Sequence, residues 1–208
     1  MEDVLSVYSR PYDEKYPVVC MDEKPIQFFA DFRKSRKSKN GTTYEDYAYI
    51  RNGTACIFMF TEPLQGWRYA DAQERRTRQD WAKQIEWLLI KQYPKAEKVI
   101  LVMDNLNTHS IASLYAAFEP QYAFTLASRL DIHYTPKHGS WLNIAEIELS
   151  SLGRQCLLNN RIPDLQVLKT LIAPWCVDRN KKQKGVDWQF TNDDARSKLK
   201  HLYPILKF

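Results

Sequence analysis

Three acidic residues carry the chemistry that this sequence best supports. Asp22 ends the apolar run VVCMD, Asp104 ends the apolar run VILVMD, and Glu146 follows SWLN in a predicted helix. Ligands of open α/β sheets gather at the carboxyl ends of strands, so acids that end two strands can converge there. Converging carboxylates repel one another and resist ionisation unless a cation neutralises them. A single such aspartate more often only ends a strand, but two with a third acid in reach predict a shared cation site.

Glu146 and Glu148 compete for the third position of this site. Two residues apart on a helix correspond to roughly 200° of rotation, so the two side chains cannot face one centre. Ala145 and Leu149 place the predicted buried stripe next to Glu146. We expect Glu146 to be the ligand, Glu148 to face solvent or a partner molecule, and Asn143 to cap the helix.

Oxygen ligands with few histidines or cysteines nearby suit hard cations such as Mg²⁺, with Mn²⁺ as a substitute. Two such ions about 3.5–4 Å apart can activate a nucleophile and stabilise the leaving oxygen in phosphodiester chemistry. The same geometry serves water in strand cleavage and a DNA 3′-hydroxyl in strand joining. The acids therefore predict two-metal phosphoryl transfer without a covalent protein nucleophile.

Other polar residues flank the three acids. Asn105 and His109 follow Asp104 in the pattern D-N-x-x-x-H, and we expect Asn105 to orient a ligand or contact phosphate. For His109, a role in the site and a satisfied surface position are equally compatible with the sequence. Lys137 and His138 precede the helix of the third acid, where both can contact phosphates of the scissile strand.

Basic residues outnumber acidic ones by 30 to 25, giving a net charge of +5, which is compatible with a polyanionic partner. Residues 33–39, RKSRKSK, place five cations in seven positions of a predicted loop. Such a loop beside a metal site can hold duplex DNA, although a solvated loop fits the pattern equally well. A second cluster at 179–184 has the same two interpretations. The predicted DNA-binding residues are Arg33, Lys34, Arg36, Lys37, Lys39 and Lys137.

The segments that must position these residues alternate between strand and helix patterns. Apolar, β-rich runs predict strands at 16–21, 26–32, 98–103 and 131–134, and Asn52-Gly53 between 47–50 and 54–60 predicts a hairpin. Helical periodicity is found at 77–92, from about 108, at 143–158, from 165 and from 191. Thr77 with Asp80 resembles a capping box. This order predicts an α/β domain with a mixed sheet and helices on both faces.

Length and composition exclude several classes of protein. A chain of 208 residues corresponds to one domain, or to a domain with an appendage. No apolar run approaches the roughly 20 residues of a membrane span, and the first residues lack the apolar stretch of a secretory signal. The four cysteines are far apart, which predicts buried free thiols in a reducing compartment.

The sequence resembles the DDE transposases of the mariner-like superfamily, in the bacterial branch called the insertion sequence 630 family. The resemblance runs through nearly the whole chain. It is carried by VVCMDEKPIQ (18–27), YIRNGTACIFMFTEPLQGWR (49–68), AEKVILVMDNLNTHS (96–110), IHYTPKHGSWLNIAEIELSSLGRQCL (132–157), RIPDLQ (161–166) and VDWQFTNDDARSKLKHLYP (186–204). It implies an RNase H-like fold with a mixed five-stranded sheet flanked by helices. We expect an N-terminal arm at 1–16, because these residues are polar and include proline, a catalytic core at 17–158 and a C-terminal helical extension at 159–208.

The resemblance implies a reaction as well. Asp22, Asp104 and Glu146 match the family's three metal-binding acids, and all three are of the expected type. The family reaction is metal-dependent cleavage at transposon ends, followed by joining of a 3′-hydroxyl to target DNA at TA dinucleotides. The implied partners are two Mg²⁺ ions, double-stranded DNA of the ends and the target, and a second copy of the chain on DNA. The implied location is the bacterial cytoplasm, in association with the nucleoid.

The sequence departs from the family's pattern in one respect. Family members begin with helix-turn-helix modules that recognise the transposon ends, and this chain has no room for them before the strand near residue 17. We expect a separate helix-turn-helix subunit, a decayed copy or a catalytic fragment. Two other functions therefore stay open: a catalytically silent DNA-binding or assembly remnant, and a structure-selective nuclease acting on RNA–DNA hybrids or branched DNA.

Overall fold

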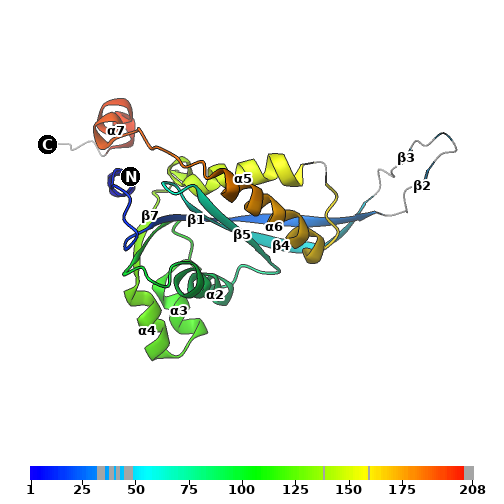
Figure 1. Cartoon of the computed structure of the whole chain (residues 1–208), viewed down its shortest axis with the longest axis horizontal. Coiled ribbons are helices and arrows are strands. Elements are labelled where there is room, and N and C mark those ends of the chain that lie inside the picture. Colours follow the sequence, from blue (N-terminus) through cyan, green and yellow to red (C-terminus); the bar gives the residue numbers. More distant parts are fainter. Residues whose placement is uncertain are drawn as a thin grey trace.

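A central five-stranded sheet organises the computed structural model, which describes residues 1–31, 36–37, 40, 43–44, 49–137, 139–158 and 160–203. The strands are β1 (Val18–Asp31), β4 (Tyr49–Glu62), β5 (Trp67–Gln73), β6 (Val99–Met103) and β7 (Leu130–Tyr134). They lie in the order β5-β4-β1-β6-β7, with β1 antiparallel to β4 and parallel to β6. The predicted mixed five-stranded sheet is confirmed. Two short strands, β2 (Arg36–Lys37) and β3 (Thr43–Tyr44), pair beyond the far end of β1 and β4 (Figure 1).

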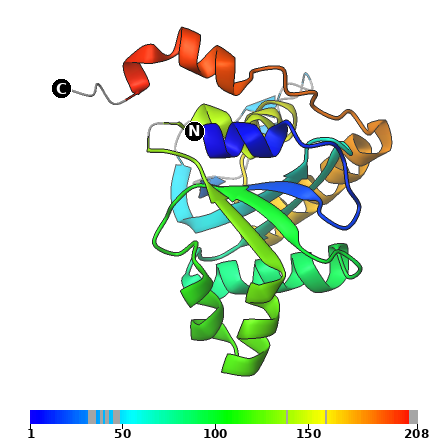
Figure 2. The same ribbon diagram turned by 90° about the vertical axis from the view of Figure 1, so that its left-hand side faces the viewer.

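Helices cover both faces of this sheet (Figures 1 and 2). One layer contains α2 (Arg78–Trp87), the π-helix η1 (Leu88–Gln92), α3 (Ile111–Ala117) and α4 (Pro120–Ser128). The other contains α5 (Ile144–Leu152), the π-helix η3 (Gly153–Leu157) and α6 (Leu165–Lys182). Successive side chains of β4 alternate between the two layers: Phe58 packs with the α2 layer and Ile57 with the α5 layer. Burial on both faces explains why this strand is almost continuously apolar.

The predicted hairpin at Asn52-Gly53 is wrong, because β4 runs through both residues. The pairing with β1 shifts between Gln27 and Phe29, so that Asn52 and Gly53 together oppose Phe28. Gly53 has a φ of +94°, and it therefore opens a β-bulge instead of a turn. A residue outside the sheet stabilises the bulge: Asn52 Nδ2 donates to the carbonyl of Pro163 at 2.8 Å.

Strand β1 is also longer than predicted. The strand predicted at 16–21 does not stop at Asp22. It continues to Asp31 and joins the second predicted strand in one element. Residues 20–31 of β1 pair with 49–61 of β4 on either side of the bulge. The partner strand, and not the apolar pattern, decides where β1 ends.

Several helix predictions are confirmed. Thr77 and Asp80 form the expected capping box of α2, and Trp81 and Ile85, one turn apart on this helix, are fully buried. The predicted helix at 143–158 is present as α5 followed by η3. Helix α4 was not predicted: Pro120 occupies its first position, where the missing N–H of proline costs nothing.

The two ends of the described chain pack together. The first 16 residues, predicted to be an arm, begin with α1 (Glu2–Tyr8), which buries Val4, Leu5, Val7 and Tyr8. Figure 2 shows α1 beside α7 (Asn192–Lys198), and the Arg196 guanidinium of α7 donates to both carboxylate oxygens of Glu2 at 2.7 and 2.8 Å. Short 3₁₀ helices, η2 (Ser140–Leu142) and η4 (Lys200–Leu202), precede α5 and follow α7.

The four cysteines of the chain are free thiols. Cys20, Cys56 and Cys176 are buried free thiols and Cys156 is a partly buried one, as expected. Within the described residues, no helix combines the length and apolar composition that crossing a bilayer requires.

The capping box of α2 gives a stability prediction. Thr77→Ala removes the oxygen that accepts from the Asp80 amide, and we expect the free energy of unfolding to fall by about 1 kcal/mol in urea denaturation. Thr77→Ser keeps a capping oxygen and should lose less than about 0.5 kcal/mol. Equal losses in both variants would show that the cap does not contribute.

Candidate functional site

Two of the predicted acids come together because β1 and β6 are parallel neighbours. The register pairs Val18 with Ile100 and Cys20 with Val102. Continued by two residues, it places Asp22 level with Asp104, the first residue after β6. Adjacent strands lie about 4.8 Å apart, so the two aspartates lie side by side where β6 ends. The even-numbered residues Val18 and Cys20 belong to the core under α5, and Asp22 follows them on this face.

The third acid reaches the same place through an anchored helix. Asn143 is the predicted N-cap of α5: its Oδ1 accepts from the Ala145 amide at 3.2 Å. The same side chain donates from Nδ2 to the carbonyl of Met21 at 2.9 Å and is almost fully buried. Because Met21 precedes Asp22, this cap ties the first turn of α5, which contains Glu146, to the strand beside the first acid.

The pKa of Asp22 is shifted by burial and by the other two acids. Burial is the largest cause that raises the pKa of Asp22, against the opposing effect of the Glu23 amide, which donates to Asp22 Oδ1 at 2.7 Å. With the negative charges of Asp104, Glu146 and Glu23 added, the pKa of Asp22 is raised to about 7. The structure therefore brings all three predicted acids into one electrostatic cluster.

Carboxylate oxygens are the donors that Mg²⁺ and Mn²⁺ prefer, so the chemistry of this cluster fits a divalent metal. Burial and the neighbouring carboxylates, which together raise the pKa of Asp22, both disfavour its negative charge, and a bound cation would offset both effects. In the described part of the chain, no group of three or more His, Cys, Asp or Glu side chains already has the arrangement of a metal site. One oxygen of Asp104 is engaged elsewhere, with His109.

His109 bridges two carboxylates from inside the protein. Its Nδ1 lies 2.6 Å from Asp104 Oδ1 and its Nε2 lies 2.9 Å from Glu23 Oε1. Burial lowers the pKa of this fully buried histidine, but the two carboxylates outweigh burial and raise the pKa to about 9. At neutral pH the imidazolium therefore donates to both acids. The alternative of a satisfied surface histidine is wrong.

Glu23 is a member of this network that the sequence analysis missed. It follows Asp22 on β1, so its side chain leaves the opposite face of the sheet, where it is buried and lies 3.9 Å from Arg76 Nη1. The available signal for Glu23 was an acidic residue at an inward-facing position of a strand that is buried on both faces.

The other predicted site residues lie in different parts of the structure, and some lie outside the described residues. Asn105 and Lys137 are exposed, Asn105 directly after Asp104 and Lys137 before η2. Arg36 and Lys37 form β2, beyond the helical layers (Figure 1). Residues outside the described part of the chain are Arg33, Lys34, Lys39 and His138.

The prediction that Glu148 faces solvent or a partner is wrong. Its carboxylate is buried and accepts from Arg68 Nε at 2.8 Å and from Arg68 Nη2 at 3.0 Å. The physical reason is that α5 is covered on both flanks: β1 lies beside Glu146, and the edge strand β5 supplies a guanidinium to Glu148. An arginine inside the alternating strand WRYADAQ was the available signal.

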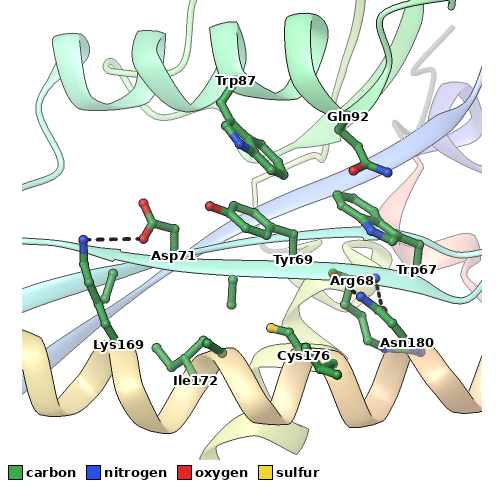
Figure 3. A pocket seen from close by; sticks show the side chains of 14 residues that line it. Trp67, Arg68, Tyr69, Asp71, Trp87, Gln92, Lys169, Ile172, Cys176 and Asn180 are labelled. Carbon is green, nitrogen blue, oxygen red and sulfur yellow. Dashed lines mark hydrogen bonds and ion pairs between the residues drawn. The ribbon is translucent and has the colours of Figure 1, made fainter.

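A cavity of about 460 Å³ lies along β5, between α2 and α6 (Figure 3). Stacked aromatic rings form one wall, with the centroids of Tyr69 and Trp87 3.8 Å apart. Ile172 and Cys176 of α6 contribute to the other wall. None of the three acids lines this cavity, so the candidate site is defined by the carboxylate cluster and not by the cavity.

A mixed sheet in the order β5-β4-β1-β6-β7, with acids on β1, after β6 and on α5, defines an RNase H-like protein with an acidic cluster. The family described as DDE superfamily endonuclease matches residues 17–169, and the chain belongs to this family. The predicted relation to DDE enzymes is thereby confirmed. No curated protein matches the sequence.

Solved structures show the same fold. One is the Mos1 mariner paired end complex with Mn (17% identity, TM-score 0.58, covering 87% of this chain and 54% of that chain). Another is the Mos1 strand transfer complex (17%, 0.56, 87% and 55%). A third is a pre-cleavage Mos1 transpososome (16%, 0.55, 91% and 60%). The present chain thus spans little more than half the length of the Mos1 chains.

The raised pKa of Asp22 gives a prediction for metal-free protein. Its folded-state value of about 7 exceeds the unfolded value of about 3.9, so ionised Asp22 lowers stability above pH 7, and this cost disappears as the pH falls to about 4. We expect Asp22→Asn to raise the thermal midpoint by at least about 2 °C at pH 8 in EDTA. The gain should vanish at pH 4.

Asp187→Asn, at an exposed aspartate, is the matched control and should leave the thermal midpoint unchanged at both pH values. A midpoint that falls in Asp22→Asn at pH 8 would contradict a repulsive cluster.

Proposed function

We propose that this chain is the catalytic domain of a transposase that cleaves and joins DNA strands by two-metal phosphoryl transfer. The observation that supports the proposal is the placement of Asp22 level with Asp104 on parallel neighbours, with the first turn of α5, which contains Glu146, tied to β1 by Asn143, in a chain of the DDE endonuclease family. Membership of this family favours DNA as the substrate and phosphodiester bonds as the bonds that break and form.

The three acids would hold two Mg²⁺ ions, or Mn²⁺ in their place. Bound metal supplies activation of the attacking water or 3′-hydroxyl and neutralisation of charge on the leaving oxygen. The protein's own contribution is positioning: Asn143 fixes the first turn of α5 against β1, and the His109 imidazolium orients Asp104 while Glu23 holds the imidazolium.

Several neighbouring residues are proposed to contact DNA. Exposed Asn105 is adjacent to Asp104 and can orient a metal ligand or bind phosphate, and exposed Lys137 can bind the scissile strand together with His138. The basic residues of 33–39 would bind the duplex backbone, more weakly as salt increases. These residues are Arg33, Lys34, Arg36, Lys37 and Lys39.

The proposed partners follow from the relatives. The Mos1 structures include a paired-end complex with the left transposon end, and by analogy we propose transposon-end and target duplexes as the ligands here, bound by two copies of the chain. A helix-turn-helix subunit or domain would recognise the ends, in the bacterial cytoplasm at the nucleoid. Within the chain, we propose 17–158 as the catalytic core and 159–208 as a helical extension of it.

An activity assay tests the proposal. Asp104→Asn should lower Mg²⁺- or Mn²⁺-dependent nicking and strand joining by at least about a hundredfold, because it removes a metal ligand worth several kcal/mol of transition-state stabilisation. The measurement is nicking of supercoiled plasmid and joining of a labelled 3′-hydroxyl duplex, with EDTA as the blank. Asp187→Asn is the control.

Each other outcome rejects the proposal in a different way. Nicking without joined products indicates a structure-selective nuclease. DNA binding without nicking by the unaltered chain indicates a silent binding module. Full activity in Asp104→Asn rejects the assignment of the site.

A second prediction concerns His109. Loss of a side chain that orients a metal ligand costs about 10–100-fold in metal affinity or activity, and we expect a loss of this size in Mn²⁺ affinity for His109→Gln by calorimetry. His133→Gln, at a histidine that hydrogen-bonds Asp3 outside the cluster, should bind Mn²⁺ like the unaltered chain. Unchanged affinity in His109→Gln would contradict the orienting role.

A further inference from the structure

Arg68 lies at the centre of a buried polar network on the side of α5 away from Asp22. Its guanidinium donates to both oxygens of Glu148, to the carbonyl of Gly66 at 2.6 Å and to the carbonyl of Lys184 at 2.8 Å. Only 2% of the Arg68 side chain and 4% of the Glu148 side chain are exposed. A bidentate, desolvated pair of this kind has one geometry, so it fixes orientation as well as distance.

Helix α6 is attached to the same two residues. Arg179 of α6 donates from Nη2 to Glu148 Oε1 at 3.2 Å, so that two guanidinium groups face one carboxylate. The next residue, Asn180, accepts from the Arg68 amide and donates to the Arg68 carbonyl, both at 2.8 Å (Figure 3). Through these contacts α6 is joined to β5 and α5 at a single point.

The segment after α6 closes over the network. Gly66 has a φ of +65°, and a Cβ there would lie 2.6 Å from the backbone carbon of Gln183. A Cβ on Gly185 would lie 2.8 Å from the carbonyl oxygen of Pro63, which accepts from the Val186 amide at 2.8 Å. The backbones of 63–66 and 183–186 are therefore in direct contact, and the Arg68 guanidinium bonds to both segments.

We propose that Arg68, Glu148 and Arg179 form a clamp that positions Glu146 for metal binding, so that α6 and segment 183–186 are part of the support of the metal site. Glu148 is two residues after Glu146 on α5, which corresponds to roughly 200° around the helix axis. Holding Glu148 toward β5 therefore sets the rotation of α5 and directs Glu146 toward β1. Asn143 fixes the end of the helix, and the clamp fixes its rotation.

The clamp residues are positioning residues and touch neither metal nor DNA. This inference rests on the proposed function, because it presupposes a metal site at Glu146. Removing one member leaves an uncompensated charge in a buried place, so a loss of stability alone would not distinguish positioning from general support. The experiment must therefore measure metal affinity against a control of matched burial.

Glu62 provides that control. Its carboxylate is as buried as that of Glu148, with 5% of the residue exposed, and its Oε2 accepts from the Tyr93 hydroxyl at 2.7 Å on the α2 side of the sheet. The test compares Glu148→Gln with Glu62→Gln in metal-free thermal unfolding, in Mn²⁺ calorimetry and in plasmid nicking across a range of Mn²⁺ concentrations. Arg179→Gln, which keeps the Arg68–Glu148 pair, is the second variant in case Glu148→Gln does not fold.

If the clamp positions Glu146, Glu148→Gln and Glu62→Gln should differ in their affinity for Mn²⁺. Glu148→Gln should lower the thermal midpoint, because it leaves the buried Arg68 guanidinium without its carboxylate, whereas Glu62→Gln removes a carboxylate whose pKa is raised by burial and should not lower it. Only Glu148→Gln should weaken Mn²⁺ binding, by tenfold or more, with nicking recovering as Mn²⁺ is increased. Arg179→Gln should weaken Mn²⁺ binding in the same direction, by about threefold. A loss of Mn²⁺ affinity in Glu62→Gln as large as in Glu148→Gln would overturn the clamp, since removal of any buried carboxylate would then have the same effect.

Asp104→Asn, titrated in parallel, separates failure of the clamp from failure of the metal site. If Asp104→Asn loses Mn²⁺ binding while Arg179→Gln and any folded Glu148→Gln bind like the unaltered chain, the clamp alone is overturned. If Asp104→Asn also binds Mn²⁺ with unaltered affinity, the metal site falls and the clamp falls with it.

Discussion

Repulsion between carboxylates in a partly buried space is the constraint on which the rest of this molecule depends. Parallel pairing of β1 and β6 brings Asp22 level with Asp104, and α5 adds Glu146 from above the sheet. Burial and the two neighbouring charges raise the pKa of Asp22 to about 7, so the arrangement is unfavourable without a cation. Functional sites commonly sacrifice stability in this way, and the surrounding fold must compensate for it.

The compensation comes from polar contacts between distant elements. Asn143 joins α5 to β1, His109 joins the loop after β6 to the opposite face of β1, and Arg68 joins α5 to the sheet edge. Each contact is buried and hydrogen-bonded at more than one atom, so each constrains direction as well as distance. The apolar cores on the two faces hold the layers together, whereas these three contacts determine how the layers are oriented at the acids.

The sequence predicted the features that depend on local signals. The capped helix at Thr77 and the mixed sheet follow from capping residues, periodicity and the alternation of strand and helix patterns. The assignment of Asp22, Asp104 and Glu146 as metal ligands rests on the same kind of signal together with a family resemblance, and it stays a prediction. The errors concern features decided by distant partners. Whether Asn52-Gly53 makes a turn or a bulge depends on β1, and the burial of Glu148 depends on an arginine 80 positions earlier. His109 is buried because of Glu23, 86 positions away.

The amide of Asn180 has a consequence for how molecules of this protein meet one another. Strand β5 is the outer strand of the sheet, and outer strands are templates for the addition of further strands from other chains. At Arg68 the asparagine side chain already supplies the acceptor and the donor that an incoming backbone would offer. A single side chain thus protects this position of the sheet from edge-to-edge aggregation.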